Sequence, residues 1–201
     1  MSVLTFPLQY PVTATFSLLS IGQTVRVTDA SDTQILFVKQ KAFRLKTDVI
    51  VYANEQEAHP VYRIHGDRMV GSVKYVVSTP DGRALGSIQR KWGSVLWSAT
   101  YRVFDANDTE IGTIRQKNPW VRVLHGLVEE IPLVGVVAGM WVNPTYVVEV
   151  PAGTPVMHLV KKRSFTSRRF VIEALASLRR ETEQLVVPAV ITFALMERAR
   201  A

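Results

Sequence analysis

The chain has 201 residues, 47% hydrophobic and 20% charged, a balance that excludes an intrinsically disordered protein and allows one sizeable core. It contains no cysteine, which excludes a disulfide scaffold and a thiolate metal site. The formal net charge of +7 is uneven, because residues 161–201 hold nine Lys and Arg against four Asp and Glu, and this local excess of +5 favours anionic partners.

The N-terminal segment, residues 1–16, predicts no secretory signal, because no basic stretch precedes an uninterrupted apolar run. Two later runs, Ile131–Val142 and Leu185–Met196, are strongly apolar. Each is about twelve residues long, whereas a membrane-spanning helix needs about twenty. We therefore expect both runs to be core elements, and we expect the protein to be cytoplasmic.

Three stretches repeat one hairpin pattern, in which a turn rich in Asp, Asn, Gly, Pro or Ser separates two β-rich arms. The stretches are Val27–Lys41, Val77–Lys91 and Val103–Lys117, with turns at Asp29–Asp32, Thr79–Gly82 and Asp105–Asp108. These residue types favour turns because they tolerate positive φ or bond to their own backbone. A weaker fourth copy, Val147–Lys162, turns at Pro151–Gly153. Each copy ends in a lysine, which we expect at the exposed end of a strand; these are Lys41, Lys91, Lys117 and Lys162.

The outgoing arm of each repeated hairpin carries apolar residues three positions apart, which a regular strand would place on opposite faces. The pairs are Ile35 and Val38, Leu85 and Ile88, and Ile111 and Ile114. A β-bulge near Gly86 and Gly112 would return both members of a pair to one face. Alternatively, these strands are buried on both faces.

Further strands are predicted at Phe16–Leu19, Val49–Tyr52, Pro60–Ile64 and Leu96–Thr100. His65–Asp67 predicts a turn, and Phe170–Ala176 fits either a helix or a strand. Short strands at regular spacing, without crossover helices, indicate an antiparallel sandwich or barrel. Since no linker divides the chain, we expect a single domain over residues 1–201, with residues 1–14 as an N-terminal extension.

The most basic segment is Lys161–Arg169, where five of nine residues are Lys or Arg. Basic side chains attract anionic headgroups, and an aromatic residue among them suits a membrane interface. The candidate lipid- or anion-binding residues are Lys161, Lys162, Arg163, Phe165, Arg168 and Arg169. The same composition also fits a solvated loop.

Leu185–Met196 predicts a helix that is apolar on nearly all sides, followed by Arg198 and Arg200, which suit a helix C-terminus. The helix, at about residues 184–199, begins at Thr182–Gln184 or has Pro188 in its first turn. A helix that is apolar all round must be buried all round, and a chain of strands can bury it inside a closed barrel. We therefore expect a mainly β fold, a closed antiparallel β-barrel around a central C-terminal helix. A filled lumen argues against a small-molecule carrier.

The sequence does not point to catalysis. The four histidines are scattered, so a zinc site is not expected. There is no nucleophile elbow, Walker A loop or dinucleotide fingerprint. We expect a non-enzymatic protein without a cofactor or a metal.

The order and spacing of these elements resemble the LURP-one-related and phospholipid scramblase-like branch of the tubby C-terminal-like superfamily. The residues that carry the resemblance are AFRLKTDVIVY at Ala42–Tyr52, the hairpins DGRALGSIQRK and DTEIGTIRQK, Thr145–Leu175, and the terminal apolar helix. The resemblance implies a barrel of about twelve strands around a central hydrophobic helix.

The resemblance also implies a role at membranes, because tubby domains bind phosphoinositides and scramblases are tied to calcium-dependent lipid movement. The scramblase calcium segment is acidic, whereas Ser177–Gln184 offers two Glu beside two Arg, a poor calcium site. The expected function is peripheral binding to anionic phospholipid at the inner face of the membrane. The alternative is a nucleic-acid or protein-interaction scaffold, because the same charge attracts a phosphate backbone.

Overall fold

The computed structural model describes residues 7–17, 23–40, 48–69, 72–90, 100–117, 145–151, 153–163 and 167–198. Within these ranges the chain forms β-strands followed by one helix. They are β1 (Val12–Ser17), β2 (Gln23–Thr28), β3 (Gln34–Gln40), β4 (Asp48–Tyr52), β5 (Pro60–Met69), β6 (Ser72–Ser78), β7 (Ala84–Arg90), β8 (Thr100–Asp105), β9 (Glu110–Gln116), β10 (Thr145–Val150), β11 (Thr154–Arg163), β12 (Ser167–Ala174) and α3 (Arg180–Arg198).

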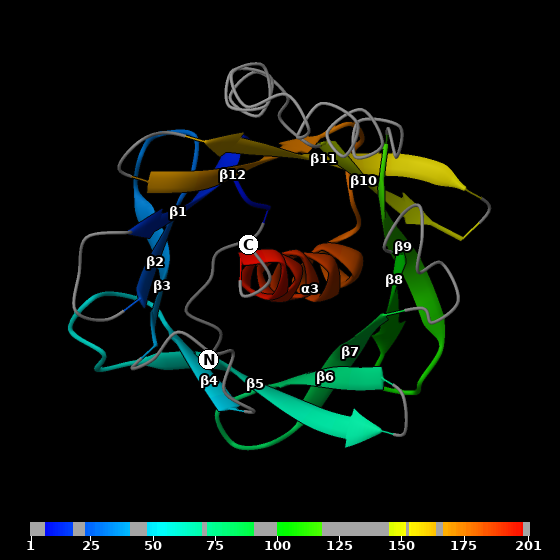
Figure 1. Ribbon diagram of the computed structural model, residues 1–201, viewed down its shortest axis with the longest axis horizontal. Helices are drawn as coiled ribbons and strands as arrows, with labels where there is room; N and C mark the ends of the chain where they lie inside the picture. Colours follow the sequence, from blue (N-terminus) through cyan, green and yellow to red (C-terminus); the bar gives the residue numbers. More distant parts are fainter. Residues whose placement is uncertain are drawn as a thin grey trace, which may run out of the picture.

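The twelve strands form one closed barrel in which each strand pairs antiparallel with its neighbours in the sequence (Figure 1). The ring closes where β1 pairs with β12, from Val12 opposite Ile172 to Ser17 opposite Ser167. Closure leaves the sheet without an open edge. The predicted fold class, including the implied number of strands, is confirmed.

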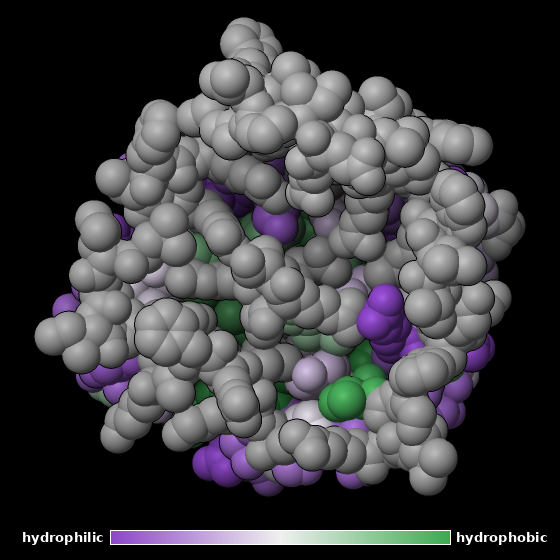
Figure 2. Space-filling model, viewed as in Figure 1, coloured by the Kyte–Doolittle hydropathy of each residue, from purple (hydrophilic) through white to green (hydrophobic). Residues whose placement is uncertain are grey.

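Helix α3 lies along the middle of the barrel, surrounded by the strands (Figure 1). Every residue from Val186 to Met196 is buried. The ring of Phe193 makes edge-to-face contacts with Tyr101 and Tyr146, at centroid distances of 5.0 and 4.7 Å. Each large apolar side chain buried in this way contributes about 1.5–3 kcal/mol of gross stabilisation. Among the described residues in Figure 2, hydrophilic ones lie mostly around the periphery and apolar ones toward the middle.

The helix begins at Arg180, ahead of the predicted start, and Pro188 lies inside it. The alternative that placed Pro188 in the first turn is therefore wrong. An internal proline removes one backbone hydrogen bond and normally weakens a helix. Burial on all sides holds the helix together despite that loss. The Thr192 hydroxyl donates to the carbonyl oxygen of Pro188 at 2.8 Å, a bond that does not replace the missing N–H.

The outgoing arms contain β-bulges, which decides between the two alternatives left by the sequence. Val77 pairs with Gly86 and Ser78 with Ala84, so Leu85 is the extra residue. Shifts of the same kind leave Ile111 extra in β9 and Ile35 extra in β3. These extra residues pack against the core from partly buried positions.

Glycine is required beside two of these bulges because a neighbouring backbone comes very close. A Cβ atom on Gly86 would lie 2.3 Å from the carbonyl oxygen of Phe104. On Gly112 it would lie 2.6 Å from the carbonyl oxygen of Glu149. Both distances are far below van der Waals contact, so any side chain there would force the strands apart.

The hairpin turns form where the sequence predicts them. The Asp29 carboxylate accepts hydrogen bonds from the backbone N–H groups of Ser31 and Thr33, both at 2.9 Å. Asp105 makes the equivalent bonds in its own turn. The fourth residue of each turn has positive φ, at 59° for Asp32, 93° for Gly82 and 58° for Asp108.

Three predictions need correction or completion. The turn predicted at His65–Asp67 is wrong, because these residues lie in β5, where all three pair with β6 and His65 also pairs with β4. Phe170–Ala176 is a strand, mostly within β12. The first strand begins at Val12, so the predicted extension of residues 1–14 includes part of β1. Ile131–Val142 and all of Leu96–Thr100 except Thr100 lie outside the described residues.

The two ends of the barrel differ in their connections. At one end, which we call the turn end, β2–β3, β4–β5, β6–β7, β8–β9 and β10–β11 are joined by short turns, and α3 begins. At the opposite, distal end, the connecting residues lie outside the described ranges. Helix α3 runs from the turn end toward the distal end. No helix among the described residues combines the length and hydropathy needed to cross a membrane.

Candidate functional site

The basic segment lies at the distal end of β11 and β12, where the ladder brings most of it together. The facing pairs are Lys161 with Phe170, Lys162 with Arg169, and Arg163 with Arg168. Phe165 lies outside the described residues, and of Arg163 and Arg168 the structure describes the backbone positions. The segment interpreted as a loop is therefore largely strand, with β11 extending to Arg163 and β12 starting at Ser167.

Strand geometry separates Lys161 from its neighbours, because successive side chains point to opposite faces of a sheet. Lys161 faces the barrel interior and is 5% exposed. Its ammonium group lies 5.8 Å from the centroid of the Phe170 ring, within the range of a cation–π contact. The sequence grouped Lys161 with the exposed cations, whereas the structure places it in the interior and leaves Lys162 and Arg169 exposed on the outer surface.

Lys162 and Arg169 form a pair of like charges directly opposite each other on neighbouring strands. Such an arrangement destabilises a sheet unless another group neutralises it. Within the described part of the chain, neither side chain is in an ion pair. Arg63, another exposed cation without an ion-pair partner there, lies instead opposite Ile50 and Ser78.

Elsewhere on the outer wall, many cations are neutralised by a nearby carboxylate. These pairs are Arg26–Glu55, Lys39–Glu57, Lys74–Asp108, Arg102–Glu110 and Arg115–Glu149. The hydrogen bond between Arg115 and Glu149 lowers the pKa of Glu149 and raises the pKa of Arg115. Against this background, Lys162 and Arg169 differ in being an exposed pair of facing cations without a carboxylate partner among the described residues.

Glu183, one of the two carboxylates weighed for calcium, has a structural role. It is 2% exposed in the first turn of α3, and its Oε1 accepts hydrogen bonds from the Tyr10 hydroxyl at 2.7 Å and the Leu8 backbone N–H at 3.2 Å. Burial, reinforced by Glu183, raises the pKa of Tyr10 far above its usual value. The described residues contain no group of three His, Asp or Glu that could hold a metal ion.

A histidine–carboxylate pair that the sequence did not reveal lies on the outer face of β4 and β5. His65 Nδ1 and Asp48 Oδ1 are 2.6 Å apart, and this hydrogen bond raises the pKa of His65. The sequence predicts a turn at His65–Asp67 and therefore no pairing with Asp48. The β4–β5 register brings the two residues together. Both side chains are more than half exposed, so solvent surrounds the pair.

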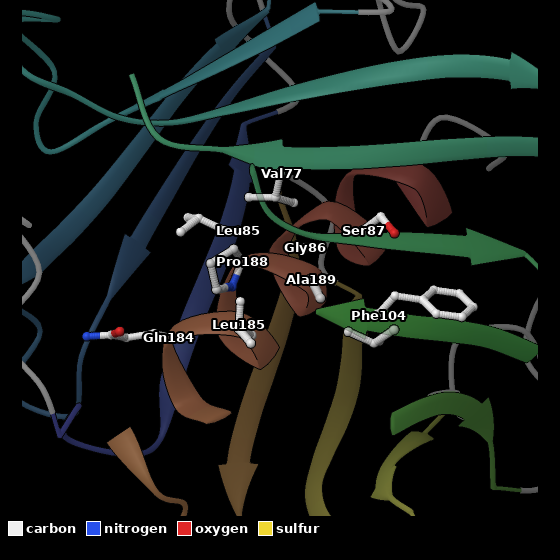
Figure 3. A pocket seen from close by; sticks show the side chains of 10 residues that line it. Val77, Leu85, Gly86, Ser87, Phe104, Gln184, Leu185, Pro188 and Ala189 are labelled. Carbon is white, nitrogen blue, oxygen red and sulfur yellow. The ribbon is translucent and has the colours of Figure 1, made fainter. Parts of the chain in front are cut away.

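A small cavity lies between α3 and strands β6 to β8, with Val77, Phe104 and Pro188 among its lining residues (Figure 3). Its volume of about 10 Å³ is close to the minimum for one water molecule. It is far below the several hundred Å³ typical of ligand sites. This cavity is too small for a lipid or another organic ligand, in keeping with a lumen filled by α3.

The sequence model described as LURP-one-related matches residues 34–187, from the start of β3 into α3. The match spans 154 of the 201 residues. It leaves out β1 and β2, which complete the ring by pairing with β12 and β3. No curated protein and no solved structure matches the chain.

Proposed function

The chain belongs to the LURP-one-related family of the tubby-like superfamily, and from that premise we propose that it binds peripherally to anionic phospholipid at a membrane surface. The observation that carries the proposal is the exposed pair of facing cations, Lys162 and Arg169. In the proposed role, these side chains contact phosphate or carboxylate groups of the lipid headgroups.

The electrostatics of the pair favour an anionic partner. Each basic residue close to an anionic membrane contributes about 1 kcal/mol to binding. An anion placed between Lys162 and Arg169 would also relieve their mutual repulsion, which no described carboxylate does. Arg163 and Arg168 occupy the next facing positions of the same ladder, so the backbone of two further basic residues lies beside the pair.

The proposed role is binding without catalysis. Tubby-like barrels of this family are generally non-catalytic. The barrel interior is occupied by α3, which favours recognition of the lipid headgroup at the outer surface over uptake of the acyl chain. A location at the inner face of the membrane is part of the proposal, since anionic lipids give that leaflet its negative surface potential.

Vesicle co-sedimentation tests the proposal, with vesicles of phosphatidylcholine alone or mixed with phosphatidylserine. The native chain should sediment with the anionic vesicles, and added salt should weaken binding because it screens exposed charges. The double variant Lys162→Ala/Arg169→Ala should bind about 30-fold more weakly, as expected for two lost contributions of about 1 kcal/mol.

Arg63→Ala provides the matched control. Arg63 is exposed and has no ion-pair partner among the described residues, and its strand β5 lies across the barrel from β11 (Figure 1). This variant should bind like the native chain. Equal binding to neutral and anionic vesicles, or full binding by the double variant, would reject the proposal. A gel shift with RNA or DNA at physiological salt, without vesicle binding, would favour the nucleic-acid scaffold.

A further inference from the structure

Basic residues collect at the distal end of the barrel wall. Within the last two positions of each strand at this end, the basic residues are Lys39, Arg68, Arg90, Arg115, Lys162, Arg163 and Arg168. Lys117 follows directly after β9 and is exposed. Lys39 and Arg115 are ion-paired, and the one acidic residue at these described positions, Asp48, is hydrogen-bonded to His65. The distal end is therefore strongly basic.

Acidic residues collect at the turn end. In the last two positions of the strands and in the described turns they are Asp29, Asp32, Glu55, Glu57, Asp81, Asp105, Asp108, Glu110, Glu149 and Glu173. Arg83 is the basic residue in these same turns, and Arg179 and Arg180 lie where α3 begins. The charges along the barrel axis are therefore largely divided into an acidic pole and a basic pole, with two ion pairs, Lys39–Glu57 and Arg115–Glu149, joining members of the two sets.

From this polarity we infer that the barrel meets the membrane end-on, with the distal end toward the bilayer and the turn end toward the solvent. The inference rests on the proposed function and adds an orientation to it. An anionic surface attracts the basic pole and repels the acidic one, so the two electrostatic effects favour the same orientation.

The length of the barrel makes this orientation effective. The longest strands, β5 and β11, have 10 residues each, which is about 33 Å along the strand and about 25 Å along the axis for the usual strand tilt of about 40°. The Debye length at physiological salt is about 8 Å. With the distal end on the membrane, the acidic residues of the turns would lie farther from the surface charge than the basic residues of the distal end. Glu57 and Glu149 are exceptions, because they are ion-paired with Lys39 and Arg115. Contact through the side of the barrel would bring both poles close to the surface charge.

Two single-cysteine variants in one hairpin test the orientation, and the lack of native cysteine makes labelling specific. Lys117→Cys places a polarity-sensitive dye at the distal end after β9, and Asn107→Cys places it in the β8–β9 turn. Both native side chains are exposed. Saturating phosphatidylserine-containing vesicles should shift the emission of the Lys117→Cys label to shorter wavelength and reduce its quenching by acrylamide. The Asn107→Cys label should change in neither respect.

The outcomes separate the orientation from the binding itself. If labelled protein sediments with vesicles but both labels respond alike, or only the Asn107→Cys label responds, the end-on orientation is wrong while the proposed function stands. If neither labelled variant nor the native chain sediments with anionic vesicles, both are wrong. Lys117→Cys removes one cation, so about fivefold weaker binding is expected, and the measurement is made at saturation.

Discussion

The two ends of the barrel differ in how their charged side chains are neutralised. At the turn end, Asp29 and Asp105 cap their own turns, and several other carboxylates are ion-paired. The Leu8–Tyr10 segment is tied there to α3 through Glu183. At the distal end, Lys162 faces Arg169 without a described neutralising group. The polar groups at the turn end therefore stabilise the fold, whereas the facing Lys162 and Arg169 at the distal end repel each other and, in the proposed function, contact an anionic partner.

Helix α3 spans both ends, so removing its central aromatic ring should have the largest effect. Phe193→Ala should lower the free energy of unfolding by about 3–5 kcal/mol, because it leaves a cavity against Tyr101 and Tyr146. Urea denaturation followed by circular dichroism measures the change. The control is Leu175→Ala, at a side chain that is 46% exposed, which should change stability by less than about 0.5 kcal/mol. A similar small loss for Phe193→Ala would show that the helix does not support the barrel.

The second largest loss of stability should follow removal of the hydrogen bond between Tyr10 and Glu183 at the turn end. Tyr10→Phe removes the hydroxyl that donates to Glu183 and should cost about 1.5–3 kcal/mol, the range for a hydrogen bond to a charged group. Combining it with Glu183→Ala, which removes the acceptor, in a double-mutant cycle measures the coupling between the two side chains. Additive losses of stability would mean that the Tyr10 hydroxyl and Glu183 act independently. The hydrogen bond between them would then not hold the Leu8–Tyr10 segment to α3.

At the distal end, one substitution should move stability and binding in opposite directions. Arg169→Glu replaces the facing like charges with an opposite-charge pair and should raise the free energy of unfolding by about 0.2–1 kcal/mol. The same change should weaken binding to anionic vesicles, because it puts a carboxylate beside Lys162. Denaturation and co-sedimentation of one preparation test both effects. A loss of stability together with undiminished binding would contradict the contrast between the two ends.

The smallest expected effect concerns the exposed His65–Asp48 pair. Because donation of a hydrogen bond to the Asp48 carboxylate raises the pKa of His65, Asp48→Asn should move that pKa down toward the ordinary value of about 6.5. A raised pKa adds stability below the unfolded-state pKa and loses it as pH rises through the folded-state pKa. For so exposed a pair, the change is best followed by NMR titration of the His65 ring. An unchanged titration curve in Asp48→Asn would show that another group raises the pKa.

Local chemistry explains the features that could be predicted from the sequence. Asp and Gly at the turns act through their own backbone, so their positions indicate hairpins whatever surrounds them. The apolar character of Leu185–Met196 requires enclosure on every side. This requirement predicts a closed barrel independently of how the strands pair. The basic composition of Lys161–Arg169 located the candidate surface in the same way.

Other features depend on strand register and on contacts between residues distant in the sequence. The β11–β12 ladder turned Lys161 inward and placed Lys162 opposite Arg169, and the bulges returned apolar residues three apart to the core. The link between Tyr10 and Glu183 joins residues 173 positions apart. The amino-acid sequence by itself determined the kinds of elements and the need for a closed wall around the helix, because these follow from composition and local geometry. It could not determine which side chains face each other across the barrel, because a shift of one residue in strand register reverses the faces.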